Sequence, residues 1–298
     1  MDLTPSDAVR AAHLVEPVAL AALLAGDAPP VVLDVRWALG RPDGRAAHRE
    51  ARVPGSVYVD LETELAGHGT PTDGRHPLPQ VADLQAAARR WGVRRGSAVV
   101  VLDDVAGLSA ARAWWLLRWA GLTDVRVLDG GLAAWRAAGL PLAAGEPEPP
   151  APGDVVLSAG RLPVVDADGA AALAGGGRLL DARAGERYRG EVEPVDPRAG
   201  HVPGSVSAPT AESLDADGRL LRTAALEDRF AALGVGAGEE VGVSCGSGVT
   251  AAHLALALVL AGRRPVLYPG SWSAWSSDPA RPVAVGADPW GSEPSTGS

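Results

Sequence analysis

The feature that most constrains the fold of this chain is internal repetition: four motifs occur twice, in the same order. Aligning the motifs pairs Asp34 with Asp181, Pro54 with Pro203, Asp104 with Cys245 and Trp135 with Trp275. The matched residues are 147, 149, 141 and 140 positions apart, respectively, so the spacing is nearly constant. A tandem duplication explains this order and spacing, and the chain is therefore expected to contain two copies of one fold.

Each copy alternates short apolar runs with helical patterns. In the first copy, residues 99–102 (VVVL) are expected to form a buried strand and residues 109–120 a helix, and residues 125–128 (VRVL) begin the next strand. A strand, a helix and a strand at this spacing imply parallel pairing through a right-handed crossover. The predicted fold class is α/β, with two tandem domains that each hold a mostly parallel sheet with helices on both faces.

Composition supports a division into two domains. The predicted boundaries are residues 1–143 for a first domain, 144–158 for a linker rich in Pro and Gly, and 159–285 for a second domain that carries the cysteine. Residues 286–298 (GADPWGSEPSTGS) are expected to form a disordered tail. A chain of 298 residues is long enough for two such domains.

Charge and cysteine content exclude several classes of protein. The formal net charge is −9, which argues against binding to a nucleic-acid backbone. No basic segment followed by an apolar core occurs at the N-terminus, and no apolar stretch reaches eighteen residues, so neither a signal peptide nor a membrane partner is expected. The single cysteine, Cys245, excludes an intramolecular disulfide and a multi-thiolate metal site.

Cys245 opens a glycine-rich turn between an apolar strand and a helical pattern. The strand ends at Ser244, and the helix is expected over residues 250–260. Gly246 and Gly248 are expected to take positive φ angles and so turn backbone N–H groups inward. A ring of amides at a helix N-terminus stabilises an anion, here the thiolate, which is the reactive form of cysteine. The sequence therefore favours Cys245 as a nucleophile.

The turn has two other possible interpretations. A lone cysteine is often a small buried hydrophobe, but the matched turn of the first copy, which starts at Asp104, has no thiol and fewer glycines. A cysteine phosphatase has a similar loop that closes with an arginine, and residues 246–252 contain no arginine. A tetrahedral dianion would therefore lack its charge partner in this loop.

The motifs together resemble the rhodanese superfamily in its tandem-domain form. The resemblance extends from about residue 6 to residue 285 and is highly specific, because six motifs carry it: Asp34-Val35-Arg36, Val53-Pro54-Gly55-Ser56, Gly74-Arg75-His76-Pro77-Leu78-Pro79, Asp129-Gly130-Gly131…Trp135, His201-Val202-Pro203-Gly204-Ser205 and the closing segment Tyr268 to Trp275. The loop Cys245-Gly246-Ser247-Gly248-Val249-Thr250 is similar to that of 3-mercaptopyruvate sulfurtransferases, since thiosulfate-type loops carry basic residues after the cysteine.

The resemblance implies roles for particular residues. Arginines at the family positions, Arg187 and Arg198, are expected to bind a substrate carboxylate, although either could instead be a surface ion-pair partner. The loop residues Gly246, Gly248, Val249 and Thr250 are expected to line the substrate site.

A proton relay is also implied by the family. Ser247 would supply the hydroxyl, His76 the imidazole, and Asp60 or Glu62 the carboxylate that orients it, although His76 could simply be a polar residue of a solvated loop. His201 is interpreted as structural, bonding to backbone near the linker, and His253 as a packing residue.

The implied activity is sulfur transfer from 3-mercaptopyruvate through a persulfide on Cys245, without a metal or organic cofactor. The expected partners are a small-molecule sulfur donor and an acceptor that is thioredoxin, a small thiol or cyanide. A cytoplasmic location would keep the thiol reduced. Two alternatives remain: thiosulfate as the donor, or a persulfide relay that serves a protein partner.

Overall fold

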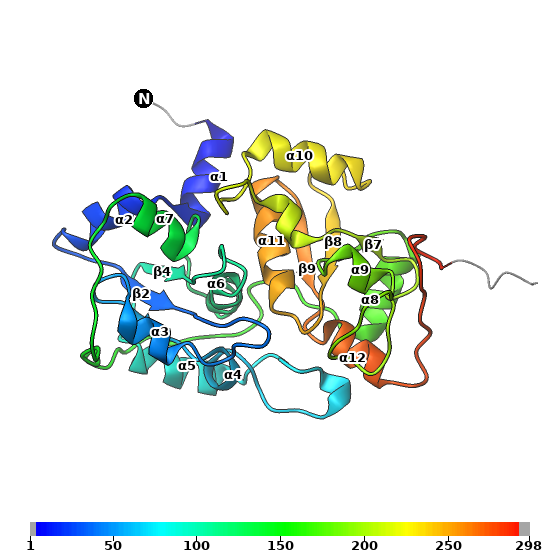
Figure 1. Ribbon diagram of the computed structural model, residues 1–298, viewed down its shortest axis with the longest axis horizontal. Coiled ribbons are helices and arrows are strands. Elements are labelled where there is room, and N and C mark those ends of the chain that lie inside the picture. The colour runs from blue at the N-terminus through cyan, green and yellow to red at the C-terminus, as the bar shows by residue number, and fades with distance from the viewer. Residues whose placement is uncertain (1–3, 292–298) are drawn as a thin grey trace, which may run out of the picture. The chain divides into compact units, whose positions relative to one another are not determined.

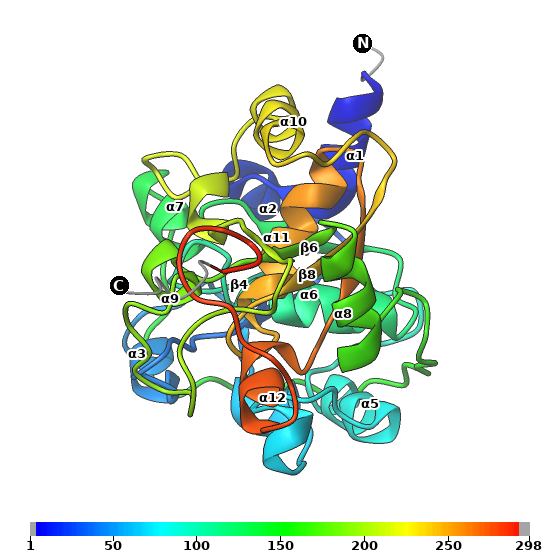
Figure 2. The same ribbon diagram turned by 90° about the vertical axis from the view of Figure 1, so that its right-hand side faces the viewer.

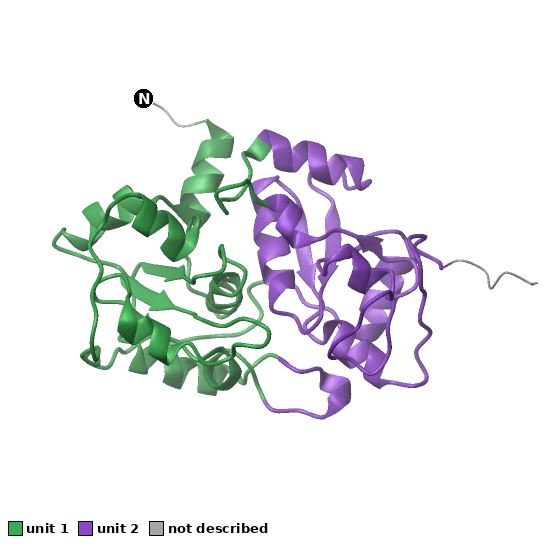
Figure 3. Ribbon diagram, viewed as in Figure 1, with its two compact units in different colours: residues 1–67, 78–162, 214–223 green, residues 68–77, 163–213, 224–298 purple. Residues whose placement is uncertain are grey.

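The computed structural model describes residues 4–291, and the chain divides into two compact units (Figure 3). Of the described residues, unit 1 comprises 4–67, 78–162 and 214–223, and unit 2 comprises 68–77, 163–213 and 224–291. Both units are α/β, and every strand pair in their two sheets is parallel, as the sequence predicts.

Unit 1 contains a five-stranded sheet with the strand order β1-β5-β4-β2-β3. The central strand β4 (Val99–Leu102) is buried at every position, so helices cover both faces of the sheet. The other strands are β1 (Leu14–Val15), β2 (Val31–Asp34), β3 (Val57–Tyr58) and β5 (Val125–Leu128). The helices of this unit are α1 (Pro5–His13), α2 (Pro17–Leu24), α3 (Arg45–Glu50), α4 (Leu61–Glu64), α5 (Val81–Arg90), α6 (Ala110–Trp119) and α7 (Gly131–Ala137).

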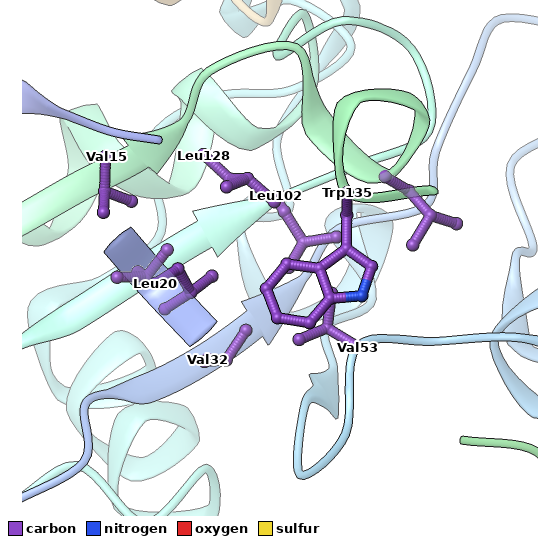
Figure 4. Packing of buried hydrophobic residues seen from close by; sticks show 9 residues of the cluster. Val15, Leu20, Val32, Val53, Leu102, Leu128 and Trp135 are labelled. Atoms are coloured by element: carbon purple, nitrogen blue, oxygen red, sulfur yellow. The ribbon is translucent and has the colours of Figure 1, made fainter. Parts of the chain in front are cut away.

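A hydrophobic cluster joins one face of this sheet to α2 and α7. Alternate residues of a strand point to the same face, which places Val100 and Leu102 of β4 together in the cluster. Leu20 of α2 and Trp135 of α7 pack against them, and Figure 4 shows the indole of Trp135 beside Val53 and Leu102. The Trp135 Nε1–H donates to the carbonyl of Pro141 at 2.8 Å, which satisfies the polar atom of an otherwise buried side chain.

Unit 2 repeats this architecture with a four-stranded sheet of order β7-β6-β8-β9 (Figure 1). Its strands are β6 (Leu179–Asp181), β7 (Val206–Ser207), β8 (Glu240–Ser244) and β9 (Arg264–Leu267). Its helices are α8 (Ala167–Gly175), α9 (Gly185–Tyr188), α10 (Thr223–Ala232), α11 (Thr250–Leu260) and α12 (Ser271–Ser277), with 3₁₀ turns η1 (Pro71–Asp73) and η2 (Thr210–Ser213). The strand before Cys245 and the helix after it are thus found where the sequence predicts them.

The strand registers correct one detail of the duplication. In unit 1, Asp34 pairs with Leu102, and in unit 2 the matching Asp181 pairs with Ser244. The residue after each strand is therefore the equivalent one, and Cys245 corresponds to Asp103. The prediction that it corresponds to Asp104 is wrong by one position, because the connections between landmarks differ in length between the two copies.

The compact units also differ from the contiguous boundaries predicted from composition. Residues 68–77 come from the first copy yet belong to unit 2, and residues 214–223 come from the second copy yet belong to unit 1. The second segment is held by Asp129, whose carboxylate accepts from Leu220 N at 2.9 Å, and by Arg10, which donates to the Leu220 carbonyl at 2.8 Å. Composition carries no signal for such an exchange.

Backbone contacts hold the predicted linker and the described part of the predicted tail, residues 286–291. Gly153 N donates to Arg89 O at 2.7 Å, which docks the Pro-rich segment 144–158 on unit 1. Residues 286–291 of the expected tail pack on unit 2, since Pro289 O accepts from Gly204 N at 2.6 Å. Residues 292–298 lie outside the described range. Across residues 4–291, no helix is long and apolar enough to cross a membrane.

Candidate active site

The candidate site in unit 2 is the turn that begins at Cys245, at the carboxyl end of β8. The turn is clamped to the start of α12, because Trp272 N donates to the Cys245 carbonyl at 2.9 Å and Ser273 N donates to the Gly246 carbonyl at 2.8 Å. In a planar trans peptide the N–H points opposite to the C=O. The amides of Gly246 and Ser247 therefore face away from α12, toward the space at the mouth of the turn.

The thiol of Cys245 lies inside this turn. The residue is 1% exposed, and its Sγ accepts a hydrogen bond from Gly248 N at 3.1 Å. Cys245 N donates to Ser271 Oγ at 3.0 Å, and Ser271 Oγ donates in turn to the Tyr268 carbonyl at 2.9 Å. Ser271 has a φ of 51°, which is uncommon for a residue other than glycine and marks backbone strain held by the surrounding structure.

Glycine occupies two positions of the turn for different physical reasons. Gly248 has a φ of +80°, and a Cβ there would lie 2.4 Å from the Pro269 carbonyl oxygen, so only glycine fits. Gly246, in contrast, does not have a positive φ, which corrects the expectation that both glycines do. A Cβ at Gly246 would lie 3.3 Å from a guanidinium nitrogen of Arg75 and 3.4 Å from one of Arg187. Glycine at position 246 therefore lets two cations lie close to the turn.

His76 and Ser247 meet in unit 2, as the relay prediction requires. His76 Nδ1 lies 2.8 Å from Ser247 Oγ, and the two residues are 4% and 6% exposed. The segment that carries His76 includes η1. This turn packs against α12 and lies beside it in both views (Figures 1 and 2). Gly74 allows this close approach, because a Cβ there would lie 2.7 Å from the Gly270 carbonyl oxygen.

The predicted carboxylates of the relay belong to unit 1 and have partners there. Asp60 caps α4 by accepting from Thr63 N at 3.2 Å and pairs with Arg45 at 2.5 Å. Glu62 accepts from Trp37 Nε1 at 2.6 Å. The orientation of His76 by either carboxylate stays a prediction.

The two predicted carboxylate-binding arginines have different environments. Arg187 lies at the candidate site, where its Nη2 donates to Glu193 at 2.6 Å and to Asp196 at 3.2 Å. Arg198 instead donates to four backbone carbonyls around the end of α12, those of Trp275, Ser276, Asp278 and Arg281. Arg198 therefore caps that helix, and the structure does not support the predicted substrate contact.

Two further cations near the turn were not singled out from the sequence. Arg75 precedes His76, forms an ion pair with Asp196, and donates its backbone N–H to Ser273 Oγ at 3.1 Å. Arg183 is buried; burial lowers its pKa, but Asp181, Glu193 and the Cys245 sulfur raise it overall. The strand-end motif Asp181-Ala182-Arg183 and the Gly74-Arg75-His76 segment were the available signals.

The remaining predicted residues are placed as follows. Val249 is buried and Thr250 begins α11, and their contacts with a substrate stay predictions. His201 is structural, as interpreted, but its ring lies against the carbonyls of Tyr188 and Pro289 rather than near the linker. His253 is fully buried with Nδ1 2.7 Å from Thr210 Oγ1. Among the described residues no cluster of His, Cys, Asp and Glu could hold a metal ion.

Fold and site together define a tandem parallel α/β protein with one buried cysteine in a turn between a strand and a helix. The family model described as "Rhodanese-like domain" matches residues 16–138 and 166–278. The chain therefore belongs to the rhodanese-like family and carries two of its domains.

Curated relatives agree with this assignment. A Pseudomonas aeruginosa protein, whose name assigns it provisionally to the 3-mercaptopyruvate sulfurtransferases, is 49% identical over 86% of this chain and 92% of its own length. A Mycobacterium tuberculosis protein, SseB, assigned provisionally by name to the thiosulfate sulfurtransferases, is 47% identical over 93% of this chain and 98% of its own length. The solved structure of the 3-mercaptopyruvate enzyme SseA from Escherichia coli superposes with a TM-score of 0.76 at 32% identity, covering 87% of this chain and 98% of that one.

Proposed function

We propose that this chain transfers sulfur from 3-mercaptopyruvate to a thiol or to cyanide through a persulfide on Cys245. The chain is a sulfurtransferase: curated relatives up to 49% identical over most of its length carry that class in their names. The observation that supports Cys245 as the sulfur carrier is its position, with Sγ on the Gly248 amide and the His76–Ser247 pair beside it.

The first half-reaction moves one sulfur atom. The Cys245 thiolate attacks the thiol sulfur of the donor, an S–S bond forms, and the C–S bond of the donor breaks. The electron pair of that bond goes to the donor carbon and yields the enolate of pyruvate, which then takes up a proton. The Ser247 hydroxyl, hydrogen-bonded to His76, is placed to donate to charge that develops on the ketone oxygen.

The second half-reaction restores the thiolate. An acceptor thiol, from a small molecule or from thioredoxin, or cyanide attacks the outer sulfur of the persulfide, and the S–S bond breaks with its electron pair returning to Cys245. The amides at the turn stabilise the anionic sulfur in both directions. A reducing cytoplasm would keep the acceptor and Cys245 in the thiol state between cycles.

The choice of 3-mercaptopyruvate over thiosulfate rests on the turn itself. Residues 246–250 supply amide and hydroxyl donors but no basic side chain, which suits a thiol and a ketone better than a sulfonate. Thiosulfate is the second candidate because the SseB relative is named for it.

Two measurements test the proposal. The first is mass spectrometry after incubation with 3-mercaptopyruvate, in which the tryptic peptide of residues 230–263 is expected to gain one sulfur atom on Cys245. The second is kcat/KM with each donor under matched conditions, where we expect 3-mercaptopyruvate to be preferred. A clear preference for thiosulfate would overturn the donor assignment while leaving the persulfide intact.

A further inference from the structure

Two guanidinium groups, not one, lie next to Gly246 in the turn that begins at Cys245. Gly246 follows the cysteine directly, and the position that a Cβ would take on it lies 3.3 Å from Arg75 Nη2 and 3.4 Å from Arg187 Nη1. These two nitrogens come from segments more than a hundred residues apart. They reach the same small volume because residues 68–77 belong to unit 2.

The nitrogens nearest to Gly246 are the ones that the protein leaves without acceptors. Arg75 uses Nη1 for its ion pair with Asp196, and Arg187 uses Nη2 for Glu193 and Asp196. Within residues 4–291, no hydrogen bond involves Arg75 Nη2 or Arg187 Nη1, and the buried Nε of Arg187 has no acceptor. Leaving the buried Nε of Arg187 without an acceptor is costly, whereas the Arg75 side chain is 31% exposed, so both arginines keep N–H groups that a ligand can use.

A shared carboxylate fixes both arginines in this arrangement. The Asp196 side chain is 2% exposed and pairs with Arg75 through one oxygen and with Arg187 through the other. Glu193 Oε1 accepts from Asp196 N at 3.1 Å as well as from Arg187, which holds the turn that presents Asp196. The two guanidiniums are thereby oriented before any ligand binds, which lowers the entropic cost of recognition.

Arg198 does not provide this second cation. Its guanidinium is committed to four backbone carbonyls at the end of α12. Arg75 is the second cation that lies beside Gly246, together with Arg187.

We propose that Arg75 is a specificity-determining residue that binds the donor carboxylate together with Arg187. The proposal rests on the function proposed above and deepens it: the favoured donors are 2-oxo acids bearing a thiol, and an uncharged thiol ketone is a poor donor. Two N–H groups that converge from two guanidiniums suit the two oxygens of a planar carboxylate. Asp196 acts as a positioning residue for both arginines.

The test compares donors that differ only in the carboxylate. The donors are 3-mercaptopyruvate and 1-mercaptopropan-2-one, in which a methyl group replaces the carboxylate. For Arg75→Ala we expect kcat/KM with 3-mercaptopyruvate to fall roughly ten- to a hundredfold, the usual effect of losing a charged hydrogen bond, with little change for the neutral donor. Arg75→Lys should be intermediate, since it keeps the charge but loses the planar group.

Arg189→Ala is the matched control. Arg189 lies two residues after Arg187, is 38% exposed and pairs with the exposed Glu191, so its loss should leave both donors unchanged. An equal loss of kcat/KM with both donors in Arg75→Ala would overturn the proposal. It would mean that Arg75 supports Cys245 or His76 and does not bind the carboxylate. Wild-type kinetics in Arg75→Ala would overturn it as well. Urea unfolding of each variant identifies any general loss of fold.

A second readout separates this proposal from the donor assignment. Pyruvate carries the same carboxylate, and its inhibition constant can be measured with whichever donor the wild-type protein uses. We expect Arg75→Ala to weaken pyruvate inhibition by a similar factor. If wild type does not use 3-mercaptopyruvate, the donor assignment fails. If pyruvate inhibits wild type and Arg75→Ala equally, the Arg75 contact fails on its own.

Discussion

The strand-to-helix turns of the two copies occupy equivalent positions but begin with different residues, Asp103 and Cys245. In unit 1, the turn begins with Asp103, which is fully buried and whose carboxylate accepts four backbone N–H groups, those of Val105, Gly107, Ser109 and Ala110. In unit 2, the equivalent turn begins with Cys245, whose sulfur accepts from Gly248 N. In both turns, the side chain of the first residue after the strand accepts from a backbone amide of its own turn, four amides for Asp103 and that of Gly248 for Cys245.

The two turns differ in the side chain that accepts from their backbone amides. The carboxyl group of Asp103 satisfies four amides of its own turn, although burial raises its pKa, and it occupies the place that another anion would need. The thiol of Cys245 is smaller and leaves the amides of Gly246 and Ser247 for a substrate or for the outer sulfur of a persulfide. The comparison teaches that the first copy keeps the architecture of an anion site and uses it for stability, whereas the second is proposed to use it for chemistry.

The largest effect is expected from replacing Cys245. Cys245→Ser keeps the size of the side chain and its contact with Gly248, but an alcohol does not ionise near neutral pH and is a poor sulfur nucleophile. We expect sulfur transfer to fall at least about a thousandfold, as losses of catalytic nucleophiles do, with no persulfide formed. Steady-state assays and mass spectrometry measure this. Retained activity in a folded Cys245→Ser protein would break the comparison.

The next effect concerns stability of the first copy. Asp103→Ala leaves four turn amides without their acceptor. Each buried donor left unsatisfied costs about 1–3 kcal/mol, so the free energy of unfolding should drop by about 3 kcal/mol or more in urea titration. Asp104→Ala is the control, because Asp104 forms an ion pair with the exposed Arg41, a contact that contributes about 1 kcal/mol at most. A larger loss of unfolding free energy in Asp104→Ala than in Asp103→Ala would contradict the structural equivalence of Asp103 and Cys245.

The smallest expected effect is on the pH dependence of stability, through a histidine in the helix that follows the Cys245 turn. His253 of α11 is fully buried, and burial, aided by Arg229, lowers its pKa from 6.5 to about 4. A lowered folded-state pKa means that the unfolded chain takes up the proton first, so this histidine lowers stability as pH falls from about 6.5 toward 4. We expect the free energy of unfolding to lose about 2 kcal/mol from this group between pH 7.5 and pH 5.

The pH effect is measured as a difference between variants. His253→Gln does not titrate, so its pH dependence in urea titrations should be shallower than that of wild type. His13 and His48 of unit 1, whose pKa values are also lowered to about 4 by burial, titrate in both proteins and cancel. Superimposable curves would show that His253 is not a source of acid sensitivity.

The fold was predictable because its signals are local. The run at residues 99–102 and the pattern at residues 250–260 became a strand and a helix, since apolar runs bounded by glycine leave few alternatives. The duplication supplied the parallel topology and drew attention to the turn at Cys245. The family assignment followed from the same motifs and is confirmed by the family model.

The rest of the site depends on tertiary contacts without a local signal. Arg75 stands in a polar turn, and only its distant partner Asp196 shows that it faces Gly246. Arg198 matches a family position in sequence, yet the carbonyls at the end of α12 occupy its guanidinium. The one-residue shift from Asp104 to Asp103 became visible only through hydrogen-bonded register.

The reciprocal exchange of residues 68–77 and 214–223 has a consequence for how such a protein can evolve and be dissected. A fragment starting at residue 159 would contain Cys245 and Ser247 but would lack the imidazole of His76 and the guanidinium of Arg75. The copy without a thiol therefore encodes parts of the other copy's site, and its gene segment cannot be discarded as a redundant half. The first copy therefore contributes to the proposed site although it carries no cysteine of its own.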